Sequence, residues 1–240
     1  GLYGLSRAEI SQILKHGEEI IFKKTVQKLC RPLILEAMKN TMMLNIEIEH
    51  IFTLIRREFL LSSMEEKNSE LFEPENIAFL QALSQQCFQS EYVYSETPEE
   101  LEHLKSLEEK LVLDLNSSES VGSRYVVEIL LISTYKPLFQ TSFYDFISNE
   151  ILEYENGLLN ETYRQQVREP LQERKIIDSI SQMTPIKDKV SEAVQLQYEE
   201  NSYPRWKSLP FGEMLNFPEF MLHNYSQYIG QKNDWPTHPN

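Results

Sequence analysis

The chain has 240 residues, 41% of them hydrophobic, which is enough apolar material for one large domain or two small ones with a buried core. Its 23 basic and 37 acidic residues give a formal net charge of −14, which repels phosphate backbones and anionic lipid head groups. We therefore expect no nucleic acid and no membrane among its partners. We also expect a cytoplasmic location, because the longest apolar stretch, YVVEILLISTY, is broken by Glu128 and is too short to span a bilayer.

Glycine is scarce, with 7 in 240 residues, and residues that favour helices outnumber those that favour strands in most segments. The chain is therefore predicted to be all-α, an irregular multi-helix array in two helical halves, residues 1–116 and 117–206. The polar run NSSES is the predicted hinge loop between the halves. Residues 207–240 are rich in proline and end on the polar run WPTHPN, and they predict an extended segment.

Hydrophobic spacing predicts two long helical regions at the start of the chain, over residues 6–39 and 41–62. Cys30 and Cys87, the two cysteines, lie among apolar helical residues, so they predict buried thiols and neither a disulfide framework nor a zinc site. Apolar residues three and four positions apart form one face of the second region and predict core positions at Leu44, Ile48, Ile51, Phe52, Ile55 and Phe59.

Two helix starts are marked by proline. Pro74 suits the first turn of a helix that carries Cys87 on its apolar face. In the run TPEE, Thr97 is a predicted cap, Pro98 the first helical residue, and Glu100 completes a capping box. A helix is therefore predicted from Pro98 to about Leu115.

Further helices are predicted in the second half of the chain. Residues 123–135 form an apolar helix that Pro137 closes, and a shorter helix covers residues 160–169, where Pro170 interrupts the pattern. A threonine followed by proline repeats the cap signal at the start of a last helix over residues 184–200.

The sequence contains no glycine-rich phosphate loop and no G-x-S-x-G motif. E-x-x-H occurs twice, as Glu47 with His50 and as Glu100 with His103, and helical bundles use such pairs for di-metal centres. We expect no metal there, because His50 points away from the apolar face. Glu100, His103 and Glu108 belong to a charged run that predicts an exposed helix face. No catalytic, cofactor-binding or metal-ligating residue is therefore assigned in this chain.

The decamer QYEENSYPRW, residues 197–206, follows the last predicted helix. Asn201 and Pro204 end that helix, because asparagine tolerates a left-handed conformation and proline blocks continuation. Two interpretations of the other side chains are open: they pack at a junction with a neighbouring domain, or some of them edge a ligand pocket there. The candidate residues are Tyr198, Glu199, Glu200, Asn201, Tyr203, Pro204, Arg205 and Trp206.

Four segments resemble, in order, the helical region of bacterial tetratricopeptide-repeat-containing class I S-adenosylmethionine-dependent methyltransferases. The segments are FLQALSQQCFQSEYVYSETPEE from Phe79, YKPLF from Tyr135, QQVREPLQER from Gln165 and MTPIKDKVSEAVQLQYEENSYPRW from Met183. The resemblance covers about residues 77–206. In that family the region lies between the repeats and the catalytic core. This chain departs from the family pattern in having no repeat signature before residue 40 and no glycine-rich cofactor loop.

The resemblance implies that the chain is a fragment of a longer methyltransferase, with residues 207–240 leading to a catalytic core that the sequence does not include. It implies that the methyltransferase domain of the same polypeptide is a partner. The resemblance does not identify the substrate, and a protein or peptide is a further expected partner. S-adenosylmethionine is implied for the parent protein, and no cofactor for this chain. The alternative is a non-catalytic helical protein-interaction module.

Overall fold

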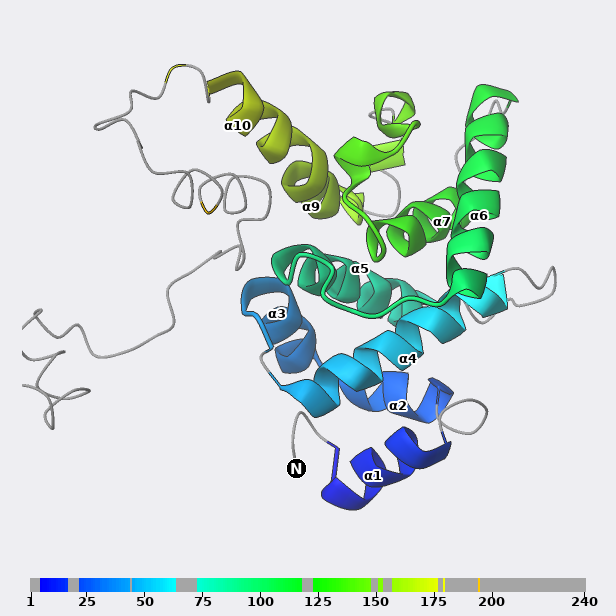
Figure 1. Ribbon diagram of the computed structural model, residues 1–240, viewed down its shortest axis with the longest axis vertical. Helices are drawn as coiled ribbons and strands as arrows, with labels where there is room; N and C mark the ends of the chain where they lie inside the picture. Colours follow the sequence, from blue (N-terminus) through cyan, green and yellow to red (C-terminus); the bar gives the residue numbers. More distant parts are fainter. Residues whose placement is uncertain are drawn as a thin grey trace, which may run out of the picture. The chain divides into compact units, whose positions relative to one another are not determined.

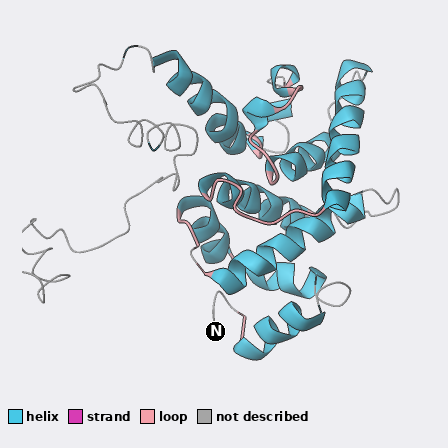
Figure 2. Cartoon of the chain, viewed as in Figure 1, coloured by secondary structure: helices cyan, strands magenta, loops and turns pink. Residues whose placement is uncertain are grey.

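The computed structural model describes residues 5–16, 22–43, 45–63, 73–117, 123–147, 151–152 and 157–176, together with residues 179 and 194 (Figure 1). All of these belong to one compact unit. Helices make up 81% of the described residues, and no strand occurs among them (Figure 2). The prediction of an all-α protein is therefore confirmed.

The long helical region predicted over residues 6–39 consists of three helices. Ser6 and Glu9 form a reciprocal box at the first start, with the Ser6 N–H donating to the Glu9 carboxylate at 2.8 Å and Ser6 Oγ accepting the Glu9 N–H at 3.3 Å. The last break falls at Arg31, whose extended backbone is what a residue before proline prefers. The helices are α1 (Arg7–His16), α2 (Phe22–Leu29) and α3 (Pro32–Asn40).

Helix α4 (Ile46–Ser63) begins later than predicted, because Thr41 ends α3 and the side chain of Asn45 caps α4. The Asn45 carbonyl oxygen Oδ1 accepts the N–H groups of Glu47 and Ile48 at 3.0 and 3.1 Å. The predicted core face is confirmed where the structure describes it, and Leu44 lies outside the described residues. The buried members of this face are Ile48, Ile51, Phe52, Ile55 and Phe59.

The two helix starts marked by proline are confirmed, since α5 spans Pro74–Gln89 and α6 spans Pro98–Ser117. The capping box of α6 is present. The Thr97 N–H donates to Glu100 Oε2 at 2.8 Å, and Thr97 Oγ1 accepts the Glu100 N–H at 3.2 Å.

After α7 (Ser123–Ser133) come two 3-10 turns, η2 (Leu138–Gln140) and η3 (Tyr144–Phe146), and then a continuous helical stretch. That stretch joins α9 (Asn160–Tyr163), the π-helical turn η4 (Arg164–Arg168) and α10 (Glu169–Ile176). The predicted interruption at Pro170 is therefore wrong. A π-turn is wider than an α-turn, so it separates the proline ring from the carbonyl with which it would clash in a regular helix.

Helix α5 is buried on nearly every side, because it packs against α2, α3, α7 and α9 (Figure 1). Its polar residues are consequently buried too, and they bond to neighbouring backbone. Gln89 Nε2 donates to Lys39 O at 2.8 Å, and the Gln86 amide nitrogen, turned toward Met38 O and Thr41 O, donates to both at 3.1 and 3.0 Å. The two glutamines therefore satisfy carbonyls at the C-terminal end of α3.

One hydrophobic cluster contains residues from both of the predicted halves, for example Phe79 and Leu104 from the first and Leu130 and Phe143 from the second. Phe79 stacks on Phe59 with ring centroids 6.2 Å apart and meets Phe52 edge-on at 6.3 Å. Within the described ranges, every helix is either too short or too polar to cross a lipid bilayer.

Candidate functional site

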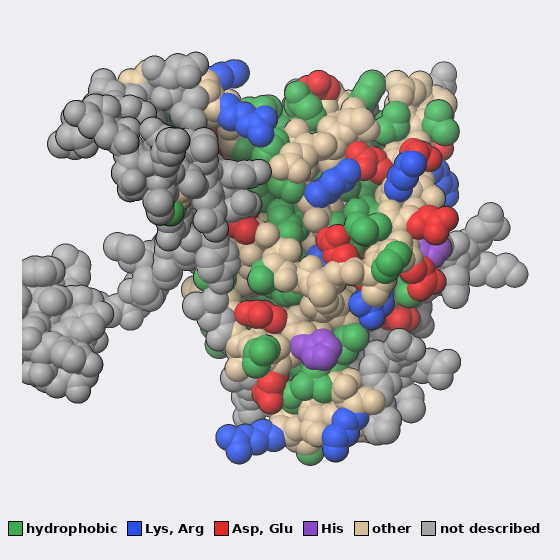
Figure 3. Space-filling view, viewed as in Figure 1, with side chains coloured by type: hydrophobic (Ala, Val, Ile, Leu, Met, Phe, Trp, Pro, Cys, Tyr) green, Lys and Arg blue, Asp and Glu red, His purple; other side chains and the backbone are tan. Residues whose placement is uncertain are grey.

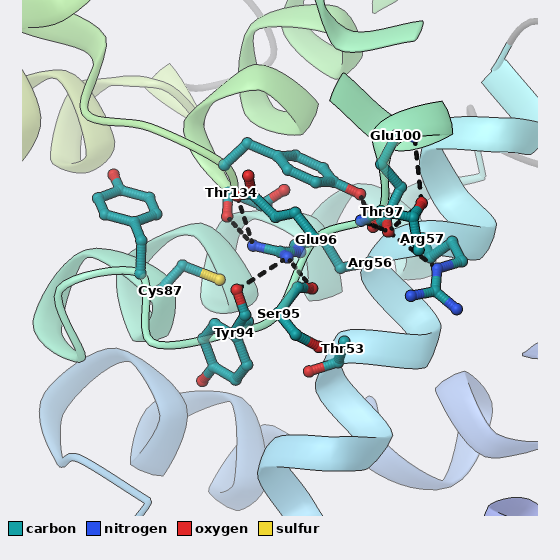
Figure 4. A network of polar contacts seen from close by, with 12 residues as sticks. Thr53, Arg56, Arg57, Cys87, Tyr94, Ser95, Glu96, Thr97, Glu100 and Thr134 are labelled. Atoms are coloured by element: carbon teal, nitrogen blue, oxygen red, sulfur yellow. Dashed lines mark hydrogen bonds and ion pairs between the residues drawn. The ribbon is translucent and has the colours of Figure 1, made fainter. Parts of the chain in front are cut away.

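The described core contains a network of charged and polar groups around Arg56 and Glu100, which joins α4, the α5–α6 loop, α6 and α7 (Figure 4). Arg56 belongs to a row with Phe52 and Leu60, four residues apart on α4, and all three are buried. Helix geometry therefore directs the arginine into the core.

The Arg56 guanidinium binds backbone carbonyls from two elements. Its Nη1 donates to Thr134 O at 3.2 Å, and its Nη2 donates to Ser95 O at 3.0 Å and to Tyr94 O at 3.5 Å (Figure 4). Nη1 also lies 3.8 Å from Glu96 Oε1. The planar donor fork thus holds the α5–α6 loop against the end of α7.

Two tyrosine rings flank the same guanidinium. Its carbon lies 4.1 Å from the ring centroid of Tyr135 and 5.5 Å from that of Tyr94. Such cation–π contacts are strengthened by desolvation, and the Arg56 side chain is 0% exposed. Arg56 Nε has no hydrogen-bond partner among the described residues.

Glu100 is also fully buried, and both of its carboxylate oxygens accept hydrogen bonds. Oε1 accepts the Tyr135 hydroxyl at 2.9 Å, while Oε2 accepts Arg57 Nε at 2.9 Å and both Thr97 donors. Burial alone would raise the pKa of Glu100, but the hydrogen bonds from Thr97, Arg57 and Tyr135 outweigh it and the pKa is lowered. The carboxylate is therefore kept charged inside the core.

The pKa values of neighbouring groups are raised instead of lowered. Burial raises the pKa of Glu96, although Arg56 opposes the shift. Burial also raises the pKa of the Cys87 thiol to about 12, again against the effect of Arg56. Burial together with the charge of Glu75 raises the pKa of Cys30 to about 12. Both thiols stay protonated at neutral pH, which makes them poor nucleophiles.

A second buried network centres on Gln166, in the π-turn η4. Its Nε2 donates to Ser84 Oγ at 3.0 Å and to Ser133 O at 3.3 Å, and its Oε1 accepts the Leu138 N–H at 3.3 Å. The hydroxyls of Ser84 and Ser133 lie 2.6 Å apart. Gln166 therefore connects η4 to α5, α7 and η2.

Both networks have the chemistry of structural junctions. The charges of Arg56 and Glu100 are compensated by named partners, and the thiol beside them is protonated. The hollow beside α1 and α2, of about 140 Å³, and the one beside α6, of about 520 Å³, are lined by other residues. Within the part of the chain that the structure describes, the two networks join helices and loops to one another.

Two expectations about exposed side chains on α6 are wrong. Glu100 is buried in the network, and the side chain of Glu108 is only 15% exposed because it binds Lys136 and Ser142. Their partners come from α4, from the loop after α7 and from the residues between η2 and η3, which the local charged run could not indicate. His103 is half-buried beside Glu99, and His50 is exposed, as its place on α4 predicts.

The described residues include no group of three or more histidine, cysteine or acidic side chains placed to hold a metal ion. The predicted helix over residues 184–200 and the decamer at 197–206 lie outside the described residues, apart from the single helical position Val194. Both interpretations of the decamer therefore stay predictions.

Sequence reasoning missed the roles of Arg56, Tyr135 and Gln166. For Arg56 a signal was present, since it interrupts the apolar row of α4 at a core position. A charged residue at such a position predicts a buried ion pair or carbonyl cluster. For Tyr135 and Gln166 the spacing within the chain carries no comparable signal.

Three of the four segments that carry the resemblance lie in the described structure and contact one another. Tyr135, in the second segment, donates to Glu100 in the first. Gln166, in the third, bonds to Ser84 in the first and to Leu138 in the second. No protein-family model, curated protein or solved structure matches this chain.

Proposed function

We propose that this chain is the helical accessory region of an S-adenosylmethionine-dependent methyltransferase, and that it docks and orients the catalytic domain of the same polypeptide. The chain itself carries no catalytic role in this proposal. S-adenosylmethionine binds to the catalytic domain, and the decamer lies at the junction between that domain and the helical region.

One observation carries the proposal: the described segments of the resemblance form a single packed unit. Segments far apart in the chain, around Ser84, Leu138 and Gln166, are joined by buried hydrogen bonds. Buried polar networks of this kind favour one arrangement of the helices over others. The packing of these three segments into one unit supports an accessory region, because such a region has to fold as a unit.

The chemistry of the described core is consistent with a docking role. Glu100 and Arg56 are engaged within the fold, and the thiol of Cys87 is buried and protonated. A rigid helical unit of this kind supplies a fixed surface on which a second domain can be oriented.

The first test is the gene sequence after the codon for Asn240. A strand followed by a glycine-rich loop within about twenty to thirty codons supports the proposal, by the placement that such loops require. A different domain there, or a stop codon, contradicts it.

The second test uses the full-length polypeptide with Trp206→Ala and Arg205→Lys. Loss of an interface anchor costs about 2 to 4 kcal/mol, so both variants should lose methyl transfer and gain protease sensitivity between the domains. Glu102→Ala is the matched control, because Glu102 is exposed on α6. If both variants behave like this control in both assays, the decamer does not lie at the junction.

A second candidate function is a non-catalytic module that binds a partner helix or peptide. The observation that favours it is the exposure of large apolar side chains, with Leu33 83% exposed and Ile46 81% exposed. Two results together would favour this function over the first. The full-length polypeptide would contain no methyltransferase core, and a protein that co-purifies with it would be lost in the Leu33→Ser or Ile46→Ser variant.

A further inference from the structure

Helix α6 carries an exposed row of residues four positions apart, Leu101, Lys105, Glu109 and Leu113. The two leucines are 50% and 69% exposed, and the side chains of Lys105 and Glu109 are 78% and 67% exposed. The buried face of α6 is a different one, formed by Glu100, Leu104, Leu107 and Leu111. The exposed row is therefore not used in the packing of α6 against α4 and α7.

The order of residues in this row is self-complementary. When a second copy of the row runs in the opposite direction beside the first, Leu101 faces Leu113 and Lys105 faces Glu109. Both pairs have residue 107 as their midpoint in the sequence. Leu107 itself is buried, but a two-fold axis level with it, on the exposed side between Lys105 and Glu109, would pair each residue of the row with its complement on a second copy. Such self-complementarity is what an isologous dimer interface requires.

A groove lies beside the row. The hollow of about 520 Å³ is lined by Lys105, Glu109 and Leu113 from the row, by Glu108 and Val112 from the next row, and by Ser142. Rows of residues four apart on two helices run parallel to each other when the helices cross at about −50°. Figure 3 shows apolar, basic and acidic side chains next to one another over α6, at the upper right of the view.

We propose that two copies of this chain associate through this row, with the α6 helices antiparallel and crossing where the row passes between Lys105 and Glu109. The dimer then holds two contacts between Leu101 and Leu113 and two ion pairs between Lys105 and Glu109, and each copy supplies one residue to each of them. Within a single copy these two side chains are 3.9 Å apart and well exposed, so exchange between copies costs little. One helix pair buries less area than most stable interfaces, and the net charge of −14 opposes association, so the dimer is weak.

The test measures self-association of the whole chain by sedimentation over micromolar to millimolar concentrations. Lys105→Glu and Glu109→Lys each place like charges opposite each other in both pairs of the dimer. Each substitution should weaken association about tenfold, because it removes the attraction between the paired charges and adds a repulsion in its place. An equimolar mixture of the two variant chains restores opposite charges in both pairs and should recover the wild-type affinity.

Controls separate the interface from folding and from general stickiness. Circular dichroism and thermal unfolding should be unchanged in both charge variants, since the two side chains are exposed. Leu113→Ser should weaken the dimer, while Leu33→Ser, at a more exposed leucine on α3, should not. The proposal is overturned if the chain stays monomeric over the whole concentration range. It is also overturned if the charge reversals leave the dimer affinity unchanged, or if mixing the two variants does not restore that affinity.

Discussion

The ring of Tyr135 lies under the guanidinium of Arg56, with 4.1 Å between the guanidinium carbon and the ring centroid, while the hydroxyl of the same tyrosine donates to Glu100. One aromatic residue at the end of α7 thus contacts a buried cation and a buried anion. Because all three side chains are almost entirely excluded from water, these contacts are little screened.

Replacing Arg56 by lysine should destabilise the protein by about 2 to 4 kcal/mol, because an ammonium cannot reach both sets of carbonyls and leaves buried acceptors without donors. Urea denaturation measures the loss. Arg31→Lys, at an exposed arginine, is the control and should match the wild type. Equal midpoints for the two variants would contradict the role assigned to the guanidinium fork.

Tyr135→Phe keeps the ring under Arg56 and removes only the hydrogen bond to Glu100. The expected cost is about 1 to 3 kcal/mol, since one oxygen of a buried carboxylate loses its partner. Tyr144→Phe, at a half-buried tyrosine in η3, is the matched control with an expected change below about 0.5 kcal/mol. A Tyr135 variant as stable as this control would show that the hydroxyl contributes nothing.

The lowered pKa of Glu100 predicts a dependence of stability on pH. The stabilisation is fully present above the ordinary carboxyl pKa of 4.5 and is lost as pH falls through the lower folded value, because the unfolded state binds the proton first. The free energy of unfolding should therefore fall more steeply below pH 4.5 in the wild type than in Glu100→Gln.

The neighbouring Glu96 has a raised pKa and contributes a slope of the opposite sign in both proteins. The charge of Glu100 is one cause of the raised pKa of Glu96, so the difference between wild type and variant reports the loss of the Glu100 carboxylate together with a smaller upward shift of the Glu96 pKa in the variant. Glu102→Gln, at an exposed position of α6, should follow the wild type at every pH. Parallel curves for Glu100→Gln and the wild type would exclude a lowered pKa.

Cys87 should be protected from thiol reagents in the folded protein. Its side chain is 0% exposed and burial raises its pKa to about 12. In a Cys30→Ser background, labelling of Cys87 should be at least about a thousandfold slower than in denaturant, because it requires opening of the core. Labelling at similar rates in both conditions would place Cys87 outside a stable core.

The features that could be predicted from the sequence are those set by neighbours along the chain. The capping box of Thr97 and Glu100 joins residues three positions apart, so its geometry follows from the first turn of α6 alone. The apolar row of α4 is equally local, since helical periodicity decides which side chains share a face. The all-α class followed from the same kind of information.

The candidate sites depended on tertiary contacts, and sequence reasoning did not find them. Glu100 was predicted from its charged neighbours to be exposed, but Arg57 and Tyr135, far from it in the chain, cover it and hold it as a buried anion. Pro170 was predicted to end a helix, yet the π-turn that holds Gln166 in its buried network lets the helix continue. Local spacing determines which residues lie on one helix face, whereas burial and charge state depend on which other elements pack against that face.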